Sequence, residues 1–164
     1  MEESTIGAAT CAVAVIMERV ALNNRWQSER WEAKGVVCDF DPASGAERVI
    51  VRAEDLMQML FPGLQIRLQR NEAEGYFLNI TSPQPMVFVL WRMRNDIARP
   101  ERVTVSYHEG ARWMDSDERV DGVPLPPELL PWMTEFVRAH YKPEPRKPKR
   151  YASNKDKGRM GRIE

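Results

Sequence analysis

The sequence predicts an α+β fold: a bent antiparallel sheet, or a partly open barrel, of six to seven strands with short helices and a C-terminal helix. Two patterns predict this fold. Short apolar stretches, several of them alternating with polar residues, are separated by turn-forming residues through the first two thirds of the chain. A stretch with apolar residues at three-to-four-residue spacing follows them. Because the sheet and the helix each have one apolar face to bury, they are expected to pack together.

Length and composition indicate a single domain. A chain of 164 residues, 43% of them hydrophobic, can build one core. No apolar run approaches the roughly 20 residues that a membrane-spanning helix needs. The start Met1-Glu2-Glu3-Ser4 lacks the basic region of a secretory signal, and two cysteines are too few for a disulfide framework. We therefore expect a cytoplasmic protein.

The first part of the chain predicts three strands and a short helix. Residues 11–20 are apolar at both parities, which indicates a strand covered on both faces or, alternatively, a short buried helix. Trp26 and Trp31 have opposite parity, so the next strand needs a bulge or break if both face inward. In chain order we expect a strand at 11–20, a turn at 22–24, a strand at 26–40 with a loop at its end (39–45), a strand at 48–52 and an amphipathic helix at 53–61.

The middle of the chain has the clearest alternation. Leu64, Ile66 and Leu68 alternate with polar residues, as in a half-buried antiparallel strand. Residues 86–93 are apolar at both parities, which indicates a central strand. In chain order we expect a strand at 64–68, a turn at 71–75, a strand at 76–80, a turn at 81–85, a strand at 86–93, a loop at 95–101 and a strand at 103–107.

The last third of the domain is expected to be helical. Residues 109–117 can form one or two helical turns, and the Gly and Pro residues of 121–127 end any helix before them. Residues 129–141 have the spacing of an amphipathic helix, with Pro131 in its first turn, where proline is tolerated.

The charges divide the chain into a domain at 1–141 and a basic, proline-containing tail at 142–164 that we expect to be disordered. The tail holds nine of the 24 basic residues and three of the 24 acidic ones, a net charge of +6, and the domain therefore carries −6. The densest basic residues of the tail are Arg146, Lys147, Lys149 and Arg150. Such a tail can bind nucleic acid, bind an acidic protein, or simply aid solubility.

The residues most suited to partner binding lie in one early segment. Tryptophan and arginine are frequent at the energetic centres of interfaces. The residues assigned here to partner contact are Arg25, Trp26, Glu29, Arg30 and Trp31. The alternative is that both tryptophans are in the core and the arginines pair with Glu29 and Glu32.

A second candidate contact is the predicted turn at 71–75. Its tip would present Glu74 and Tyr76, unless it is only a solvated turn.

Catalytic and metal-binding signals are weak. Cys11, Cys38, His108 and His140 lack the close pairing of structural zinc ligands, so we expect no metal and no cofactor. The sequence contains no GxSxG, GxxxxGK or GxGxxG motif, and we expect no enzymatic activity. An enzyme or ligand carrier would instead show a pocket where Tyr107, His108, Arg112 and Asp115 converge.

Three stretches together resemble a known family: Asn24 to Trp31, Asn71 to Pro83, and Val103 to Tyr107 continuing through Asp121 to Glu128. They resemble a bacterial family of small proteins classed only as a domain of unknown function, and the match runs over most of residues 12–141. The resemblance implies a gene neighbourhood with formate dehydrogenase subunits, iron–sulfur proteins and a second small uncharacterised protein.

The expected function is that of a non-enzymatic accessory or assembly factor acting by protein–protein contact, with a subunit of a molybdenum-containing formate dehydrogenase as the partner that the resemblance implies. One alternative is a nucleic-acid-binding regulator that uses the basic tail. A second alternative is a small-ligand-binding protein or enzyme with a pocket in the sheet.

Overall fold

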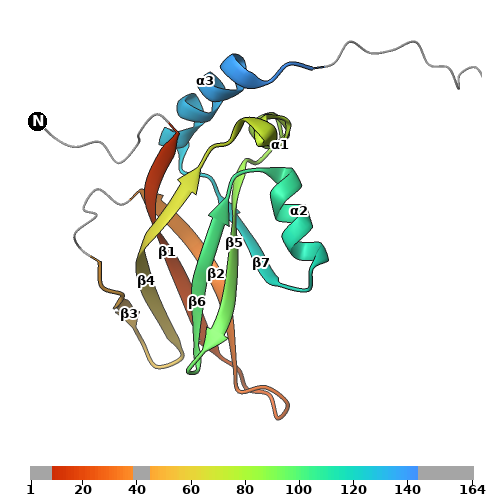
Figure 1. The fold of residues 1–164 in the computed structure, drawn as a ribbon. Helices are drawn as coiled ribbons and strands as arrows, with labels where there is room; N and C mark the ends of the chain where they lie inside the picture. Colours follow the sequence, from red (N-terminus) through yellow and green to blue (C-terminus); the bar gives the residue numbers. More distant parts are fainter. Residues whose placement is uncertain (1–8, 39–44, 144–164) are drawn as a thin grey trace, which may run out of the picture.

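The computed structural model describes residues 9–38 and 45–143 (Figure 1). In chain order its elements are β1 (Thr10–Ala21), β2 (Glu29–Cys38), β3 (Arg48–Arg52), β4 (Leu56–Arg67), a 3-10 turn η2 (Arg70–Glu72), α1 (Ala73–Ile80), β5 (Met86–Arg94), β6 (Ile97–Thr104), α2 (Tyr107–Asp115), β7 (Arg119–Pro124), a second 3-10 turn η3 (Pro127–Leu129) and α3 (Leu130–His140). The basic tail beyond residue 143 lies outside the described residues, as does most of the loop expected at 39–45.

The strands form two antiparallel sheets. The first has the order β2-β1-β4-β3 and the second β6-β5-β7. The sheets meet where β4 lies beside β6 and β2 lies beside β7. At the second junction the Asp121 carboxylate accepts hydrogen bonds from the Ala33 amide (2.8 Å) and from the Trp91 indole (2.9 Å). The fold is therefore α+β with seven antiparallel strands, as predicted, divided between two sheets that do not close into a barrel.

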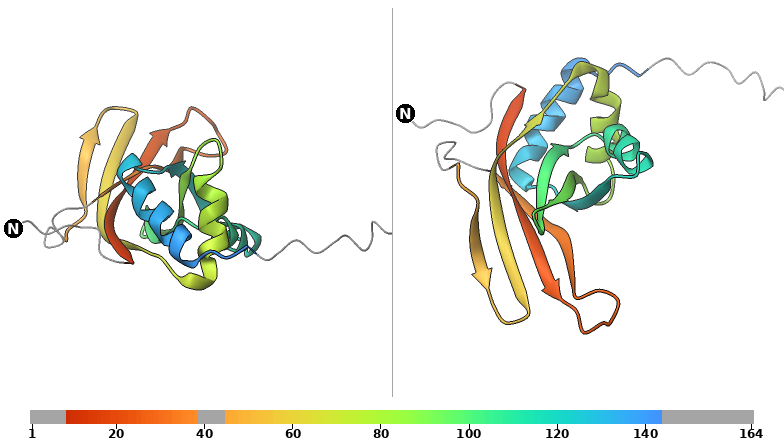
Figure 2. Two further views of the ribbon diagram at one scale, coloured as in Figure 1. Left: turned by 90° about the horizontal axis from the view of Figure 1, so that it is seen from above. Right: turned by 60° about the horizontal axis from the view of Figure 1, so that its bottom comes forward.

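The core lies between the inner faces of the sheets and continues under two helices. Val13, Val15 and Met17 of β1 are fully buried, and their neighbours on β4 face the same way. Helices α1 and α3 pack side by side over one end of the sheets (Figure 2). The Tyr76 ring of α1 meets the Phe136 ring of α3 edge to face, with 5.7 Å between centroids. These contacts fix the C-terminal helix against the sheets.

Several predicted elements are confirmed. The strands expected at 11–20, 48–52 and 86–93 correspond to β1, β3 and the central strand β5. The second strand is shorter than expected, because β2 begins at Glu29. The C-terminal helix is also present, with Pro131 in its first turn.

The helix expected at 53–61 is wrong. Residues 56–67 form one long strand, β4, which includes the strand expected at 64–68. Met57, Met59 and Phe61 are buried while the residues between them are half-buried, so the pattern has period two. Leu and Met favour helices in isolation, but pairing with β1 on one side and β3 on the other outweighs that preference.

The turn expected at 71–75 and the strand expected at 76–80 are also wrong, because these residues form η2 and α1. Gly75 lies inside α1 and does not form a turn. Its lack of a side chain allows the helix to lie close to Ser106. A Cβ atom at Gly75 would lie 2.1 Å from the Ser106 hydroxyl oxygen. The buried residues Ala73, Tyr76 and Asn79 recur every three positions, which is helical spacing.

The region after β5 contains two further differences. The loop expected at 95–101 is only a tight turn, in which Asn95 and Asp96 have φ values of 55° and 66°, and β6 begins at Ile97. Asn and Asp tolerate this left-handed backbone better than most residues. The strand expected at 103–107 ends at Thr104, and Tyr107 already belongs to α2. Strand β7, which overlaps the segment 121–127 that was expected only to end a helix, was not predicted.

Helix length adds one finding. No helix within residues 9–38 and 45–143 is long and apolar enough to cross a membrane.

Candidate functional site

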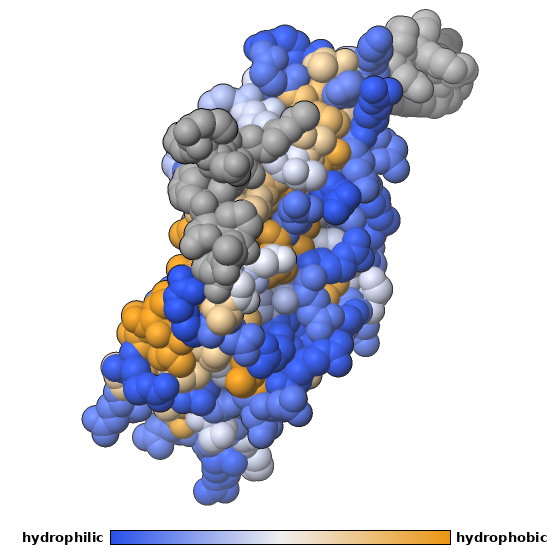
Figure 3. Space-filling view, turned by 60° about the vertical axis from the view of Figure 1, so that its left-hand side comes forward, coloured by the Kyte–Doolittle hydropathy of each residue, from blue (hydrophilic) through white to orange (hydrophobic). Residues whose placement is uncertain are grey.

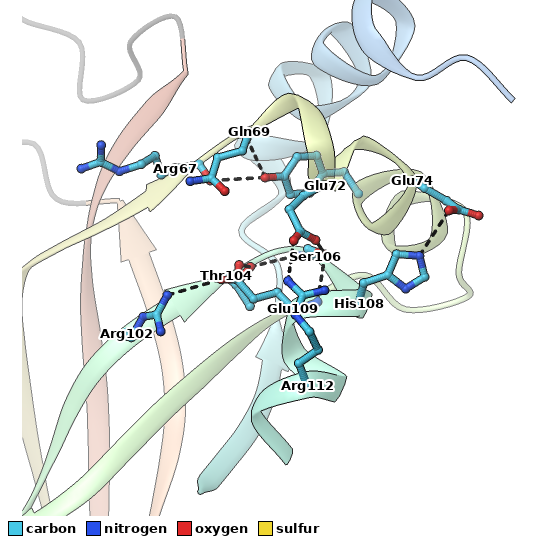
Figure 4. Close-up of polar contacts among 11 residues, drawn as sticks. Arg67, Gln69, Glu72, Glu74, Arg102, Thr104, Ser106, His108, Glu109 and Arg112 are labelled. Carbon is cyan, nitrogen blue, oxygen red and sulfur yellow. Dashed lines mark hydrogen bonds and ion pairs between the residues drawn. The ribbon is translucent and has the colours of Figure 1, made fainter. Parts of the chain in front are cut away.

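A polar cluster joins α1, α2 and β6 (Figure 4). Its centre is the Glu72 side chain, which is 8% exposed. One carboxylate oxygen accepts a hydrogen bond from the Ser106 hydroxyl (2.6 Å), and the other pairs with the Arg112 guanidinium. A buried carboxylate is tolerated only when it is paired in this way.

The remaining members of the cluster satisfy one another. Ser106 is the N-cap of α2, and its hydroxyl accepts a hydrogen bond from the Glu109 amide (3.1 Å). The Thr104 hydroxyl donates to the Glu109 carboxylate (2.6 Å), which also lies 3.4 Å from the Arg102 guanidinium. Each described charge here has a partner within the chain. The cluster therefore acts as a joint between the two helices.

Tyr76 and Glu74, the two residues expected at a turn tip, are in different environments. The Tyr76 hydroxyl accepts a hydrogen bond from the Gln69 amide (2.8 Å), and the residue is only 1% exposed. Burial raises the pKa of Tyr76 to about 12. Glu74 is exposed, with a carboxylate oxygen 3.5 Å from the His108 ring nitrogen. Tyr76 is thus a core residue that fixes η2, and only Glu74 is at the surface.

The residues considered as metal ligands or as a catalytic pocket do not form a site. The thiols of Cys11 and Cys38 are buried, and burial raises the pKa of Cys38 to about 12, which disfavours the thiolate that binds metals. Within the described residues no three His, Cys, Asp or Glu side chains are placed to hold a metal ion. Tyr107 packs on Phe88, Arg112 pairs with Glu72 and His108 lies near Glu74, so these three side chains have separate partners.

The segment from Arg25 to Trp31 connects β1 to β2 and includes the start of β2. Its two tryptophans differ in burial. Trp31 is 7% exposed and lies in the core, whereas Trp26 is 83% exposed. The loop that carries Trp26 is ordered by two hydrogen bonds: the Trp26 amide donates to the Asn24 side chain (2.7 Å), and the Leu22 amide donates to the Ser28 carbonyl (2.9 Å). The backbone therefore holds Trp26 out in solvent.

Arginine side chains cover the tryptophan rings. The guanidinium carbon of Arg25 lies 5.6 Å from the Trp26 ring centroid. Arg19 covers Trp31 at 5.9 Å, and Arg119 covers Trp91 at 5.1 Å. Such stacking holds a guanidinium flat while leaving its N–H groups free to bind.

The alternative in which Arg25 and Arg30 pair with Glu29 and Glu32 is wrong. Arg19 forms an ion pair with Glu29 (3.8 Å), and Lys34 forms one with Glu32 (4.0 Å). Among the described carboxylates, none forms an ion pair with Arg25, Arg30 or Arg119. As far as residues 9–38 and 45–143 are concerned, these three guanidinium groups are available to an external carboxylate.

An open groove adjoins this segment, and residues of both sheets line it. Its lining residues come from the hairpin, β2, β5 and β7: Gln27, Glu29, Arg30, Trp31, Trp91, Met93 and Arg119. We call these residues, together with Arg25 and Trp26, the Trp–Arg surface. Trp91, Met93 and Arg119 were not identified from the sequence. The one available signal was the change after the apolar run of β5 to Trp91-Arg92-Met93-Arg94, where a strand leaves the core.

Comparison with known proteins gives one family. A family model described as "Protein of unknown function (DUF3305)" matches residues 12–150. No curated protein and no solved structure shows a significant match.

Proposed function

We propose that this chain, which belongs to the DUF3305 family, is a non-enzymatic accessory or assembly factor that acts by protein–protein contact. The observation that supports this proposal is the Trp–Arg surface, where an ordered loop holds Trp26 at 83% exposure beside a groove. Exposure of an indole ring to water is unfavourable, so its burial by a partner stabilises the complex. The indole N–H can also donate a hydrogen bond to that partner.

The charge of the Trp–Arg surface indicates an acidic partner segment. Arg25, Arg30 and Arg119 bring three positive charges without a described internal partner. Glu29 brings the only negative charge among the residues of this surface, and it is already engaged by Arg19 and by the Trp31 indole (3.3 Å). Arginine binds carboxylates through two parallel hydrogen bonds. A segment with carboxylates on either side of an apolar residue therefore fits the groove and Trp26.

The specific partner in this proposal is a subunit of a molybdenum-containing formate dehydrogenase. The support is the gene neighbourhood that the family resemblance implies. In the proposed mechanism, the protein binds an apo-subunit or its leader in the cytoplasm and shields it until the cofactor is inserted. There the thiols of Cys11 and Cys38 would stay reduced.

The test compares Trp26→Ala with a matched control. Met114, on α2, is also a large exposed apolar residue (48%) but is not part of the Trp–Arg surface, so Met114→Ala serves as the control. The immobilised full chain should retain a purified formate dehydrogenase subunit. Truncation of an interface centre costs about 2 kcal/mol or more, so Trp26→Ala should weaken retention about 30-fold while Met114→Ala does not.

A genetic experiment gives an independent result. Deletion of the gene should lower formate dehydrogenase activity without changing its transcript, and the wild-type gene, but not Trp26→Ala, should restore it. Unchanged activity after deletion contradicts the formate dehydrogenase assignment. If the chain instead binds DNA or RNA with a steep salt dependence that is lost on removal of residues 142–164, the nucleic-acid alternative replaces this proposal.

A further inference from the structure

Among the residues that the structure describes, the four-stranded sheet has one open edge, at β3. Strand β2, at the other end of the order, is covered by β7, since the Ala33 amide donates to Asp121. Strand β3 pairs with β4 alone among the described strands. It lies at the left of Figure 1, outside the part of the sheet that faces the second sheet. An edge strand presents backbone N–H and C=O groups that can pair with another chain.

The side chains of β3 are apolar and exposed. Val49, Ile50 and Val51 are 37%, 43% and 38% exposed, and all five residues of the strand are exposed. Figure 3, which brings this side forward, shows hydrophobic residues gathered low on this face. A bulge at Ile50 breaks the simple alternation, because Val49 lies opposite Met59 and Val51 lies opposite Gln58. Successive residues of β4 point to opposite faces, so Val49 and Val51 expose apolar surface on both faces of the sheet. An added strand would cover part of it.

The strand is already ordered before any partner binds. Its pairing with β4 runs from Arg48 opposite Leu60 to Arg52 opposite Met57. At its start, Glu47 forms an ion pair with Arg99 of β6 (2.8 Å). At its end, the Ala53 amide donates to the Leu56 carbonyl (2.8 Å), which closes the turn into β4. The ordering cost of binding therefore falls on the partner segment.

In a register centred on Ile50, charge favours a different protein over a second copy at this edge. Arg48 and Arg52 stand at the two ends of the apolar stretch, and neither forms an ion pair with a described carboxylate. If two copies of the chain paired antiparallel about Ile50, each Arg48 would lie opposite an Arg52, and like charges opposite each other destabilise a sheet. A different strand with carboxylates at its ends would instead gain two favourable pairs.

We propose that the outer edge of β3 binds an extended segment of another protein, apolar at its centre and acidic at its ends, as a fifth strand of the sheet. The site is separate from the Trp–Arg surface, because β2 and β3 are at opposite edges of the sheet. The proposal does not depend on the formate dehydrogenase assignment. Two protein segments can occupy the molecule at once.

The test uses two synthetic peptides with the same Val-Thr-Val-Thr-Val centre, one flanked by Glu at both ends and the other by Lys. Fluorescence polarisation measures their binding to the full chain, to the double variant Arg48→Glu/Arg52→Glu, and to Trp26→Ala. The Glu-flanked peptide should bind at least about tenfold more tightly than the Lys-flanked one. The double variant should reverse this preference, and Trp26→Ala should leave it unchanged.

Hydrogen exchange distinguishes strand addition from loose ionic attraction. The Glu-flanked peptide should slow exchange of amides within residues 48–52, and sedimentation of the free chain should show a monomer. Absence of binding, equal affinity for both peptides, or unchanged exchange at β3 overturns the proposal. A dimer of the free chain that Ile50→Lys disperses also overturns it, because a second copy would then be the occupant.

Discussion

At the scale of single residues, the two tryptophans of the 24–31 segment show what sequence parity can and cannot predict. Opposite parity correctly indicated that Trp26 and Trp31 cannot both face inward from one regular strand. It could not indicate which one would leave the core. That depends on where β2 begins, and β2 begins at Glu29, after the loop that the Asn24 side chain orders.

Gly75 has a steric role that a sequence does not reveal, and substitution tests it. A methyl group at this position would collide with the Ser106 hydroxyl, which caps α2 and binds Glu72. Gly75→Ala should lower the free energy of unfolding by about 1–3 kcal/mol, as overpacking does. Gly35→Ala is the control, since a Cβ at Gly35 has no neighbour within 4 Å. Urea denaturation measures both, and equal midpoints would mean that α1 can shift away from Ser106.

At the scale of elements, the errors of prediction share one cause. Residues 56–61 and 76–80 are short and apolar, so local pattern alone leaves helix and strand close in likelihood. Contacts with residues distant in the sequence determine whether these segments form a helix or a strand. Strand β4 fills the gap between β1 and β3, and α1 packs under α3 with Asn79 bonded to the Met86 amide (2.9 Å) and the Val105 carbonyl (2.8 Å). The strongly patterned elements β1, β5 and α3 were predicted correctly, because their local pattern favours one type of element.

The second sheet carries a network of ion pairs, which predicts that its stability falls in acid. Arg92 of β5 bridges Glu101 of β6 (2.7 Å) and Glu118 next to β7 (2.6 Å), and Arg94 also binds Glu101. Hydrogen bonds from Arg94 lower the pKa of Glu101 below its ordinary 4.5, and those from Arg92 lower the pKa of Glu118. Because the folded-state pKa values are depressed, the stabilisation is present above about pH 4.5 and is lost as pH falls through the folded values.

Arg92→Met tests this sign. Urea midpoints measured from about pH 6 down to pH 3 should fall less steeply for Arg92→Met than for the wild type, since the variant has less of this stabilisation to lose. The effect should be small and weaken with salt, because the arginine is largely exposed. Arg138→Met, which removes an exposed pair on α3, should follow the wild-type curve. Parallel curves for all three proteins would show that the chain of ion pairs does not contribute.

At the scale of the whole molecule, the Trp–Arg surface exists only because two sheets meet. Its residues come from three separate parts of the sequence, around positions 25–31, 91–93 and 119. The sequence indicated a single bent sheet, and from that picture the neighbourhood of Trp31 and Trp91 could not be anticipated. Asp121 makes the connection, because one carboxylate oxygen binds a backbone amide of the first sheet and the Trp91 indole of the second.

This bridge links stability to partner binding. Asp121→Ala leaves the Ala33 amide and the Trp91 indole without their acceptor, and each such donor costs about 1–3 kcal/mol, so the free energy of unfolding should fall by about 2–6 kcal/mol. Asp121→Asn keeps one acceptor oxygen and should lose less. If the bridge also positions Trp91 beside Trp31, Asp121→Ala should weaken retention of the partner at temperatures where it is still folded by circular dichroism. A variant that is folded, destabilised and fully able to bind would confine binding to the Trp26 loop and remove the groove from the interface.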